Sequence, residues 1–75
     1  MNSLLIAKNL VELRGNKTQD EVSKALGISK SALSMYETAQ RIPRDAIKIK
    51  LAKYYNKSIQ LIFFDEKNDT KSDKT

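Results

Sequence analysis

The feature that most constrains this chain is a pair of short helix-forming segments separated by only two residues. Residues 18–21, Thr-Gln-Asp-Glu, have the form of a capping box, so a helix is expected to begin at Gln19. Gly27 suits the left-handed conformation that commonly follows a helix end, and Ser29 is a suitable N-cap for a second helix. Two short helices must therefore meet across a very tight turn directly after Leu26.

The residues around this turn fit two helices packed against each other. Apolar residues stand where the helices would meet, a small residue where they would cross, and a glycine in the turn. The small residue at the crossing is Ser23 and the glycine in the turn is Gly27. The apolar residues where the helices would meet are Val22, Leu26, Ile28, Leu33 and Tyr36. Each residue alone is weak evidence, because a helical hairpin in any small bundle can show the same leucines and glycine. The joint pattern favours a bihelical DNA reader, with a supporting helix from Gln19 to Leu26 and a recognition helix from Ser29 to Thr38.

Three further helices are expected around this pair. The first should run from about Ser3, as its N-cap, to Arg14, the fourth from Pro43 to about Tyr55, and a short fifth after a Ser58 cap. Two glycines and one proline in 75 residues favour helices over strands, so the sequence predicts one all-α, five-helix domain over residues 1–64. The residues expected on inner faces outside the tight turn are Leu4, Ala7, Leu10, Val11, Leu13, Ala25, Ala32, Ile47, Ile49, Leu51, Ala52, Tyr54, Tyr55, Ile59, Ile62 and Phe63.

The segment 65–75 differs from the rest in that it holds no apolar residue. Such a segment cannot offset the entropy of ordering, so a disordered polar tail is expected there. It contains four acids and three lysines, which leaves 11 of the 14 basic and 5 of the 9 acidic residues, or +6, on residues 1–64. This charge suits a polyanionic partner, although a lysine-rich soluble surface would give the same balance.

The composition argues against catalysis and against metal binding. The chain has no histidine and no cysteine, so the usual neutral-pH acid or base, the commonest metal ligand and any disulfide are all missing. We expect no enzyme activity and no cofactor. No apolar stretch approaches the roughly 20 residues that span a bilayer, and the apolar run near the N-terminus lacks a basic flank. A bacterial-type cytoplasm is the expected location.

Most of the chain, from about Leu4 to Phe63, resembles the Cro and lambda-repressor type of helix-turn-helix regulators. The resemblance lies in the Thr-Gln opening, the Leu-Gly-Ile-Ser turn, the Ser-Met-Tyr-Glu end of the recognition helix, the following Arg-Ile-Pro and the Leu-Ala-Lys of the fourth helix. It implies a five-helix, lambda-repressor-like DNA-binding domain. The sequence departs from the common family pattern at Ser23, where Ala is usual, and at Ala39, where Gly is frequent.

The resemblance also bears on Glu37, because the family pairs a glutamate at this position with an arginine of the first helix. Arg14 is the candidate partner, although its connection to Thr18 is shorter than usual in the family. Glu37 falls on the inward side of the recognition helix, so an intramolecular salt bridge is expected rather than a catalytic acid. Tyr36 is expected in the core rather than stacked on a base.

The outer face of the recognition helix supplies the candidate base contacts. A ten-residue helix about 15 Å long fits along a major groove roughly 12 Å wide. With Leu33 and Tyr36 inward, Lys30 lies at the border and could swing toward the groove, where it suits guanine O6 and N7. For Ser31 and Ser34, a solvent-exposed position without any base contact is as good an interpretation as a base contact. The residues predicted to contact bases are Lys30, Ser31, Ser34 and Met35.

A second set of residues is predicted to contact phosphates. Gln19 leads it, because the first turn of the supporting helix favours an anion and the resembling family uses the glutamine here in that way. The other members are Lys17, Thr38, Gln40 and Arg41. Four lysines, by contrast, are expected on the solvated side of the fourth helix: Lys48, Lys50, Lys53 and Lys57.

The end of the fifth helix supplies two surplus apolar residues, Leu61 and Phe64. Because regulators of this kind usually bind as twofold dimers, we expect a homodimer through the fifth helix on a pseudo-palindromic operator in double-stranded DNA. Alternatively, Phe64 folds back onto its own core. The expected function is that of a small transcriptional regulator, of the phage or prophage repressor type. The alternative of another class is a protein-interaction module, such as an antitoxin or adaptor, with the same fold.

Overall fold

The computed structural model describes residues 2–64, and all regular secondary structure in this range is helical. The all-α fold class predicted from the sequence is confirmed. The tail predicted at residues 65–75 lies outside the described residues. The elements are α1 (Ser3–Arg14), α2 (Gln19–Leu26), α3 (Lys30–Glu37), α4 (Asp45–Tyr55) and η1 (Gln60–Phe64), a short π-helical turn.

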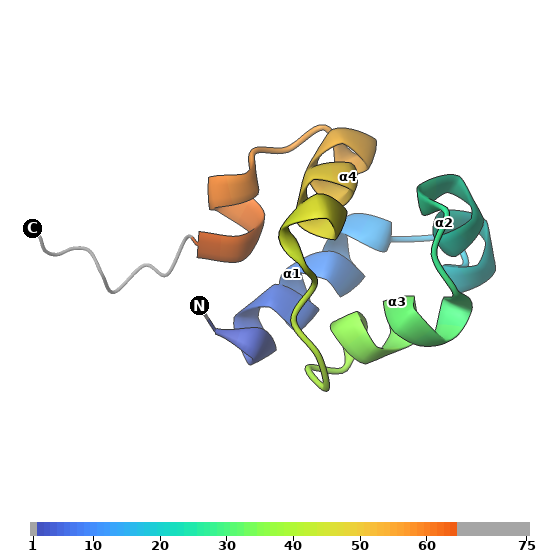
Figure 1. Cartoon of the computed structure of the whole chain (residues 1–75), viewed down its shortest axis with the longest axis horizontal. Helices are drawn as coiled ribbons and strands as arrows, with labels where there is room; N and C mark the ends of the chain where they lie inside the picture. Colours follow the sequence, from blue (N-terminus) through green and yellow to red (C-terminus); the bar gives the residue numbers. More distant parts are fainter. Residues whose placement is uncertain (1, 65–75) are drawn as a thin grey trace, which may run out of the picture.

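The helices surround α1, which lies in the middle of the molecule (Figure 1). α1 packs against α3 on one side and against η1 on the other, while α2 packs against α3 and α4. The pair α2 and α3 lies at the end of the molecule away from η1 (Figure 1). This arrangement leaves the outer face of α3 at the molecular surface.

Local side-chain caps fix the starts of α1, α2 and α3, whereas the Arg44 N-cap of α4 makes no side-chain cap hydrogen bond. Thr18 and Ser29 accept hydrogen bonds from the backbone amides three residues further on, each at 3.0 Å, as the sequence predicted for α2 and α3. Ser58 caps the chain before η1 in the same way. The expectation for α1 was wrong by one residue. Asn2 is the N-cap rather than Ser3, because its amide oxygen accepts from the amides two and three residues on, at 2.9 and 3.1 Å.

The turn between α2 and α3 is closed by the left-handed conformation of Gly27, whose φ is +73°. The amide of Ile28 donates to the carbonyl of Ser23 at 3.0 Å, which satisfies a carbonyl that the end of α2 would otherwise leave open. A side chain at position 27 would be strained at this φ. The two-residue connection therefore depends on the glycine, and it fixes the angle between α2 and α3.

One hydrophobic core joins all five elements. Leu33 is fully buried and Tyr36 is 6% exposed, so the inner face of α3 is the one predicted. Truncating a buried leucine such as Leu33 to alanine typically costs about 2–5 kcal/mol, so the core holds α3 firmly from behind. The buried members of this core are Ile6, Leu10, Val22, Leu26, Leu33, Tyr36, Leu51, Ala52, Ile62 and Phe63.

Four residues expected inside lie at the surface instead. Leu4 is 73% exposed and Val11 is 43% exposed, because the buried face of α1 is centred on Ile6 and Leu10 and these two flank it. Periodicity identified the helix correctly but placed its inner stripe too far to one side. Ala25 of α2 and Ile49 of α4 are exposed as well. A further difference is the start of α4, which begins at Asp45 after an Arg44 N-cap rather than at Pro43.

Lys48 contradicts the expectation that the lysines of α4 are all solvated. It is only 7% exposed. Its Nζ lies 5.9 Å from the ring centroid of Phe63 and 5.3 Å from that of Phe64, and 3.5 Å from an oxygen of Asp45. η1 covers the aliphatic stem, and the aromatic faces together with the carboxylate compensate the charge that is removed from water.

Candidate nucleic-acid interface

The ends of three helices meet at the carboxylate of Glu37, the last residue of α3. Its side chain is 2% exposed. Nε of Arg14, at the end of α1, donates to both carboxylate oxygens at 2.9 and 3.1 Å. Nε2 of Gln19, the first residue of α2, donates to Oε1 at 2.9 Å. The expected pairing of Glu37 with Arg14 is confirmed, and it ties the end of the recognition helix to the start of the supporting helix.

The short connection between α1 and α2 does not disturb this pairing. Nη1 of Arg14 donates to the carbonyl of Lys17 at 2.7 Å, and the amide of Lys17 donates back to the carbonyl of Arg14 at 3.0 Å. One guanidinium thus holds both the connection and the carboxylate. The side chain of Lys17 itself is exposed next to the start of α2.

Tyr55 of α4 borders the same junction. Its hydroxyl is buried and has no hydrogen-bond partner within residues 2–64. Burial, followed by the negative charge of Glu37, raises the pKa of Tyr55 from 10.0 to about 12. The phenol therefore stays protonated at all physiological pH values and adds no charge to the junction.

Gln19 occupies the position that the phosphate-contact prediction requires, at the first turn of α2. One N–H of its amide is used by Glu37, and a side-chain amide has two, so the second remains available to a ligand. Its neighbour Asp20 forms an ion pair with Lys24 at 3.2 Å, which reduces the repulsion that a free carboxylate would exert on an anion here. Gln19 is half-buried and held in place before any ligand arrives.

The predicted base-contacting residues share the outer side of α3. Lys30 and Ser31 are exposed at its start, which is where this type of motif approaches the bases. Ser34 and Met35 are only half-buried, so they are less prominent than the helical rotation suggested. Ser31 and Met35 lie one turn apart on the side opposite the buried Leu33, while Lys30 and Ser34 lie nearer the border of that side.

The loop after α3 is held by a small hydrogen-bond network. The hydroxyl of Thr38 donates to the carbonyl of Ser34 at 2.8 Å and accepts from Nε2 of Gln40 at 2.8 Å. The single proton of the Thr38 hydroxyl is therefore used inside the protein, while Gln40 retains one side-chain N–H for a phosphate. Thr38 orients Gln40 rather than offering a donor of its own.

The loop after α3 turns at Ala39, a position where glycine is frequent in the family that the chain resembles. Its φ is +65°, in the left-handed region. The amide of Gln40 donates to the carbonyl of Met35 at 2.9 Å, the hydrogen bond that closes a Schellman-type helix end. The chain thus turns as a glycine would turn it, at some conformational cost.

Arg44 is a candidate phosphate contact that sequence reasoning missed. Together with the predicted Arg41 it lines an open cavity of about 520 Å³ whose other walls are Tyr36, Ile42, Ala46 and Ile47, and no carboxylate lines it. Both arginines are exposed. The available signal was the spacing of two arginines on either side of Pro43, which keeps them on one short loop.

Other kinds of site are absent from the part of the chain that the structure describes. Residues 2–64 contain no group of three or more acidic side chains placed to hold a metal ion. None of their helices is long and apolar enough to cross a membrane.

A tight pair of helices, with the second buried on one side and carrying polar side chains on the other, defines a helix-turn-helix protein. In agreement, residues 8–62 match the Helix-turn-helix family, which is about three quarters of the chain. The protein belongs to this family, in its Cro and lambda-repressor type, and is thereby a DNA-binding transcriptional regulator that binds double-stranded DNA. Among curated proteins and among solved structures, none matches the chain.

Proposed function

We propose that this protein is a sequence-specific regulator, of the phage or prophage repressor type, that acts in the cytoplasm on a pseudo-palindromic operator. The observation that carries the proposal is the division of α3 into two sides. Leu33 and Tyr36 are anchored in the core, while Lys30 and Ser31 are exposed at the end of α3 that approaches the bases. α3 lies in the major groove and presents its start to the base edges.

Sequence is read by four side chains of α3. Lys30 donates to guanine O6 and N7, and Ser31 and Ser34 add weaker contacts because a hydroxyl can either donate or accept. Met35 packs against a thymine methyl. Half of the Met35 side chain remains exposed and is open to such a contact.

Phosphates are bound on both sides of α3. Gln19 binds one through its free amide N–H at the start of α2, with Lys17 nearby. Gln40, Arg41 and Arg44 bind the backbone on the loop after α3, where Thr38 positions Gln40. Such contacts set the position of the protein without reading sequence. The junction at Glu37 supports this arrangement, because it connects the two phosphate-binding regions through hydrogen bonds within the protein.

A homodimer through η1 gives the protein a second half-site about one helical turn away. Leu61 is 48% exposed and Phe64 is 44% exposed, so both large apolar side chains are open to a second subunit. One short helix in one groove buries too little surface for tight and selective binding. Doubling the contacts overcomes this limit.

A protein-interaction module, such as an antitoxin or adaptor, is the second candidate, and the exposure of Leu61 favours it to the same extent. The basic residues discriminate between the two. A pure adaptor has no use for Lys30, Gln19 and Arg41 on one side of the molecule, whereas a DNA-binding protein needs all three.

Selection of bound sites from random double-stranded DNA tests the proposal directly. We expect a palindromic consensus. Electrophoretic shifts with consensus and single-base variants then separate the two kinds of contact. Lys30→Ala should relax discrimination at one position, by about 1–3 kcal/mol, and Gln19→Ala should weaken binding to all sequences alike.

Lys53→Ala is the matched control, because Lys53 is an exposed lysine of α4 outside both contact sets. It should leave base preference unchanged. Binding should also fall steeply as salt is raised. Identical behaviour of the Lys30 and Gln19 variants would count against the proposed division of roles, and selection without any consensus would refute sequence-specific binding.

A further inference from the structure

The open cavity of about 520 Å³ lies where the loop after α3 meets the start of α4. Its volume falls within the roughly 300–1,000 Å³ that small-molecule sites enclose. Arg41 and Arg44 supply its charge and Tyr36 a hydroxyl, and no carboxylate lines it. The apolar walls are Ile42, Ala46 and Ile47. The cavity therefore combines positive charge with apolar surface.

The polar groups of this cavity are not used inside the protein. The side chains of Arg41 and Arg44 form no hydrogen bond or ion pair within residues 2–64. Tyr36 is 6% exposed, and its hydroxyl makes no hydrogen bond in the same range. Asp45 does not line the cavity, and its carboxylate lies 3.5 Å from Nζ of Lys48. All of these donors are therefore available to one anion.

The backbone holds both arginines in place. The amide of Arg41 donates to the carbonyl of Met35 at 3.3 Å, and the amide of Lys48 donates to the carbonyl of Arg44 at 2.9 Å. Pro43, between the two arginines, is buried. Arg44 makes no side-chain hydrogen bond to the first turn of α4, so the positive end of this helix adds to the charge of the cavity. The cavity is thus built on the fixed ends of two helices.

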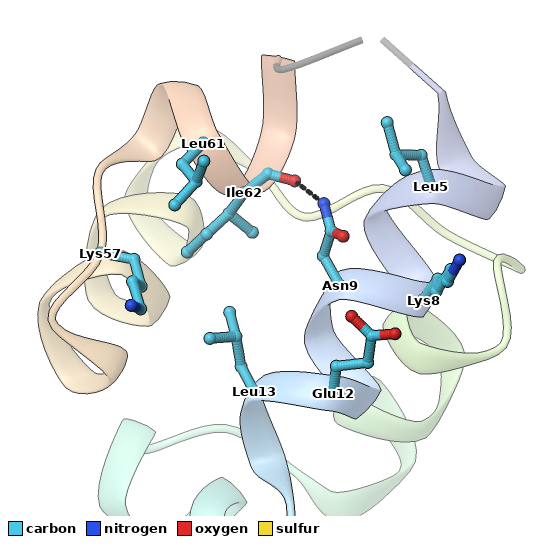
Figure 2. A pocket seen from close by; sticks show the side chains of 8 residues that line it. All are labelled: Leu5, Lys8, Asn9, Glu12, Leu13, Lys57, Leu61 and Ile62. Carbon is cyan, nitrogen blue, oxygen red and sulfur yellow. Dashed lines mark hydrogen bonds between the residues drawn. The ribbon is translucent and has the colours of Figure 1, made fainter. Parts of the chain in front are cut away.

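Two other hollows of the surface carry lysines but lack this combination. The groove between α1 and η1 contains Glu12 as well as Lys8 and Lys57 (Figure 2), so charges of both signs meet there. A hollow between α2 and α4 has three lysines in its walls. Two of these are already used, one by the carboxylate of Asp20 and one by a backbone carbonyl. Unused cations beside an unused hydroxyl therefore distinguish the cavity at the start of α4 from both.

We infer that this cavity binds a small phosphate monoester with an apolar body, and that such a ligand releases the protein from DNA. A dianionic phosphate offsets both Arg41 and Arg44, whereas a carboxylate offsets only one of them. A guanidinium suits phosphate because its paired N–H groups match two phosphate oxygens. The hydroxyl of Tyr36 donates to the same group, and the apolar body packs on the wall that includes Ile47.

Ligand and DNA compete for the same two side chains. In the proposed function Arg41 and Arg44 bind the DNA backbone, so a ligand that occupies both removes two phosphate contacts at once. The competition rests on the proposed function, whereas the site for the ligand does not. Regulation would then need no second domain, because the signal acts on the DNA-binding loop itself.

An NMR titration of the isotope-labelled full chain tests the site without DNA. The probe is phenyl phosphate at about pH 7.5, where phosphate monoesters are mostly dianionic because their second pKa is about 6. It should saturate, with the largest amide shifts at the residues that line the cavity. Inorganic phosphate lacks the ring and benzyl alcohol lacks the charge, so each should bind at least about tenfold more weakly.

Two variants and one control assign the binding to this cavity. Tyr36→Phe removes only a hydroxyl and should weaken phenyl phosphate binding about fivefold or more, because a hydrogen bond to a charged group is lost. Arg44→Ala should weaken it about tenfold or more. Lys53→Ala removes one positive charge at an exposed position outside the cavity and should leave the affinity unchanged. Circular dichroism verifies that all variants fold.

Fluorescence anisotropy with the selected double-stranded site tests the release from DNA. At constant ionic strength, phenyl phosphate at about ten times its own Kd should raise the apparent Kd for DNA about tenfold. Inorganic phosphate at the same concentration should have little effect. Tyr36→Phe should bind DNA as the wild type does when no ligand is present, and should need more phenyl phosphate for release.

The possible failures are distinguishable. Phenyl phosphate that binds no better than inorganic phosphate, or an affinity that Tyr36→Phe leaves unchanged, overturns the site. DNA binding that is indifferent to a saturating amount of phenyl phosphate overturns the release from DNA. If no DNA sequence is selected while the NMR titration gives the expected result, the proposed function fails and the ligand site stands.

Discussion

Replacing Arg14 by methionine removes the guanidinium that holds the buried carboxylate of Glu37. Leaving one member of a fully buried ion pair without its partner costs about 3–5 kcal/mol. Here the side chain of Arg14 is 21% exposed and Gln19 still donates to the carboxylate, so water and the remaining hydrogen bond offset part of this cost. We expect a loss of about 2–3 kcal/mol, against a total stability of about 3–9 kcal/mol for a domain of this size.

Urea denaturation followed by circular dichroism measures this loss. The decisive comparison is with Glu37→Gln, in which the carboxylate is replaced by a neutral amide of the same shape. In that background Arg14→Met should cost less than about 1 kcal/mol, because no buried charge is left unpaired. Equal costs of Arg14→Met in both backgrounds would refute the reasoning, since the two residues would then contribute independently.

Three further changes have defined outcomes. Tyr55→Phe should stabilise the protein by about 1 kcal/mol near neutral pH, because the buried hydroxyl has no hydrogen-bond partner within residues 2–64. Since the folded state raises the pKa of Tyr55 from 10.0 to about 12, the wild type should lose stability as pH rises through this range. The difference in unfolding free energy between the Phe variant and the wild type should therefore grow in urea titrations between pH 10 and 12. A difference that stays constant over this range would contradict the prediction. Ala39→Gly should raise thermal stability by about 0.5 kcal/mol, because glycine adopts the φ of +65° without strain; a lower midpoint would show that the loop is not strained. Lys48→Ala should destabilise the protein by about 1–2 kcal/mol, because it removes a buried aliphatic stem. Lys53→Ala, on the exposed side of α4, should change stability by less than about 0.5 kcal/mol. Equal effects of the two substitutions in thermal melts would argue against the burial of Lys48.

The elements that the sequence predicted best are those whose ends depend on neighbouring residues. Caps such as Thr18 and Ser29, and the Gly27 turn, act through hydrogen bonds and backbone conformations within a few positions of the chain. The inner side of α3 was predictable for a related reason, because Leu33 and Tyr36 recur at helical spacing. Local physical chemistry is enough to place the helix pair.

The differences arise where distant segments meet. Lys48 is buried because η1 folds across α4 and brings two aromatic rings over it, which no local pattern indicates. Leu4 and Val11 are exposed because the position of α3 and η1 around α1 decides which side of that helix is covered. Arg44 was missed because its importance depends on sharing a cavity with Arg41, which the linear sequence does not show.

The two sides of α3 also affect how this protein can change over evolutionary time. Residues that hold the helix, such as Leu33 and Glu37, are separate from residues that face outward, such as Lys30 and Ser31. Substitutions at the outward positions have little effect on stability, as surface changes generally do. A lineage could therefore acquire new operators one residue at a time, and an engineer could transplant the outward side chains of a relative, without first having to restore a damaged core.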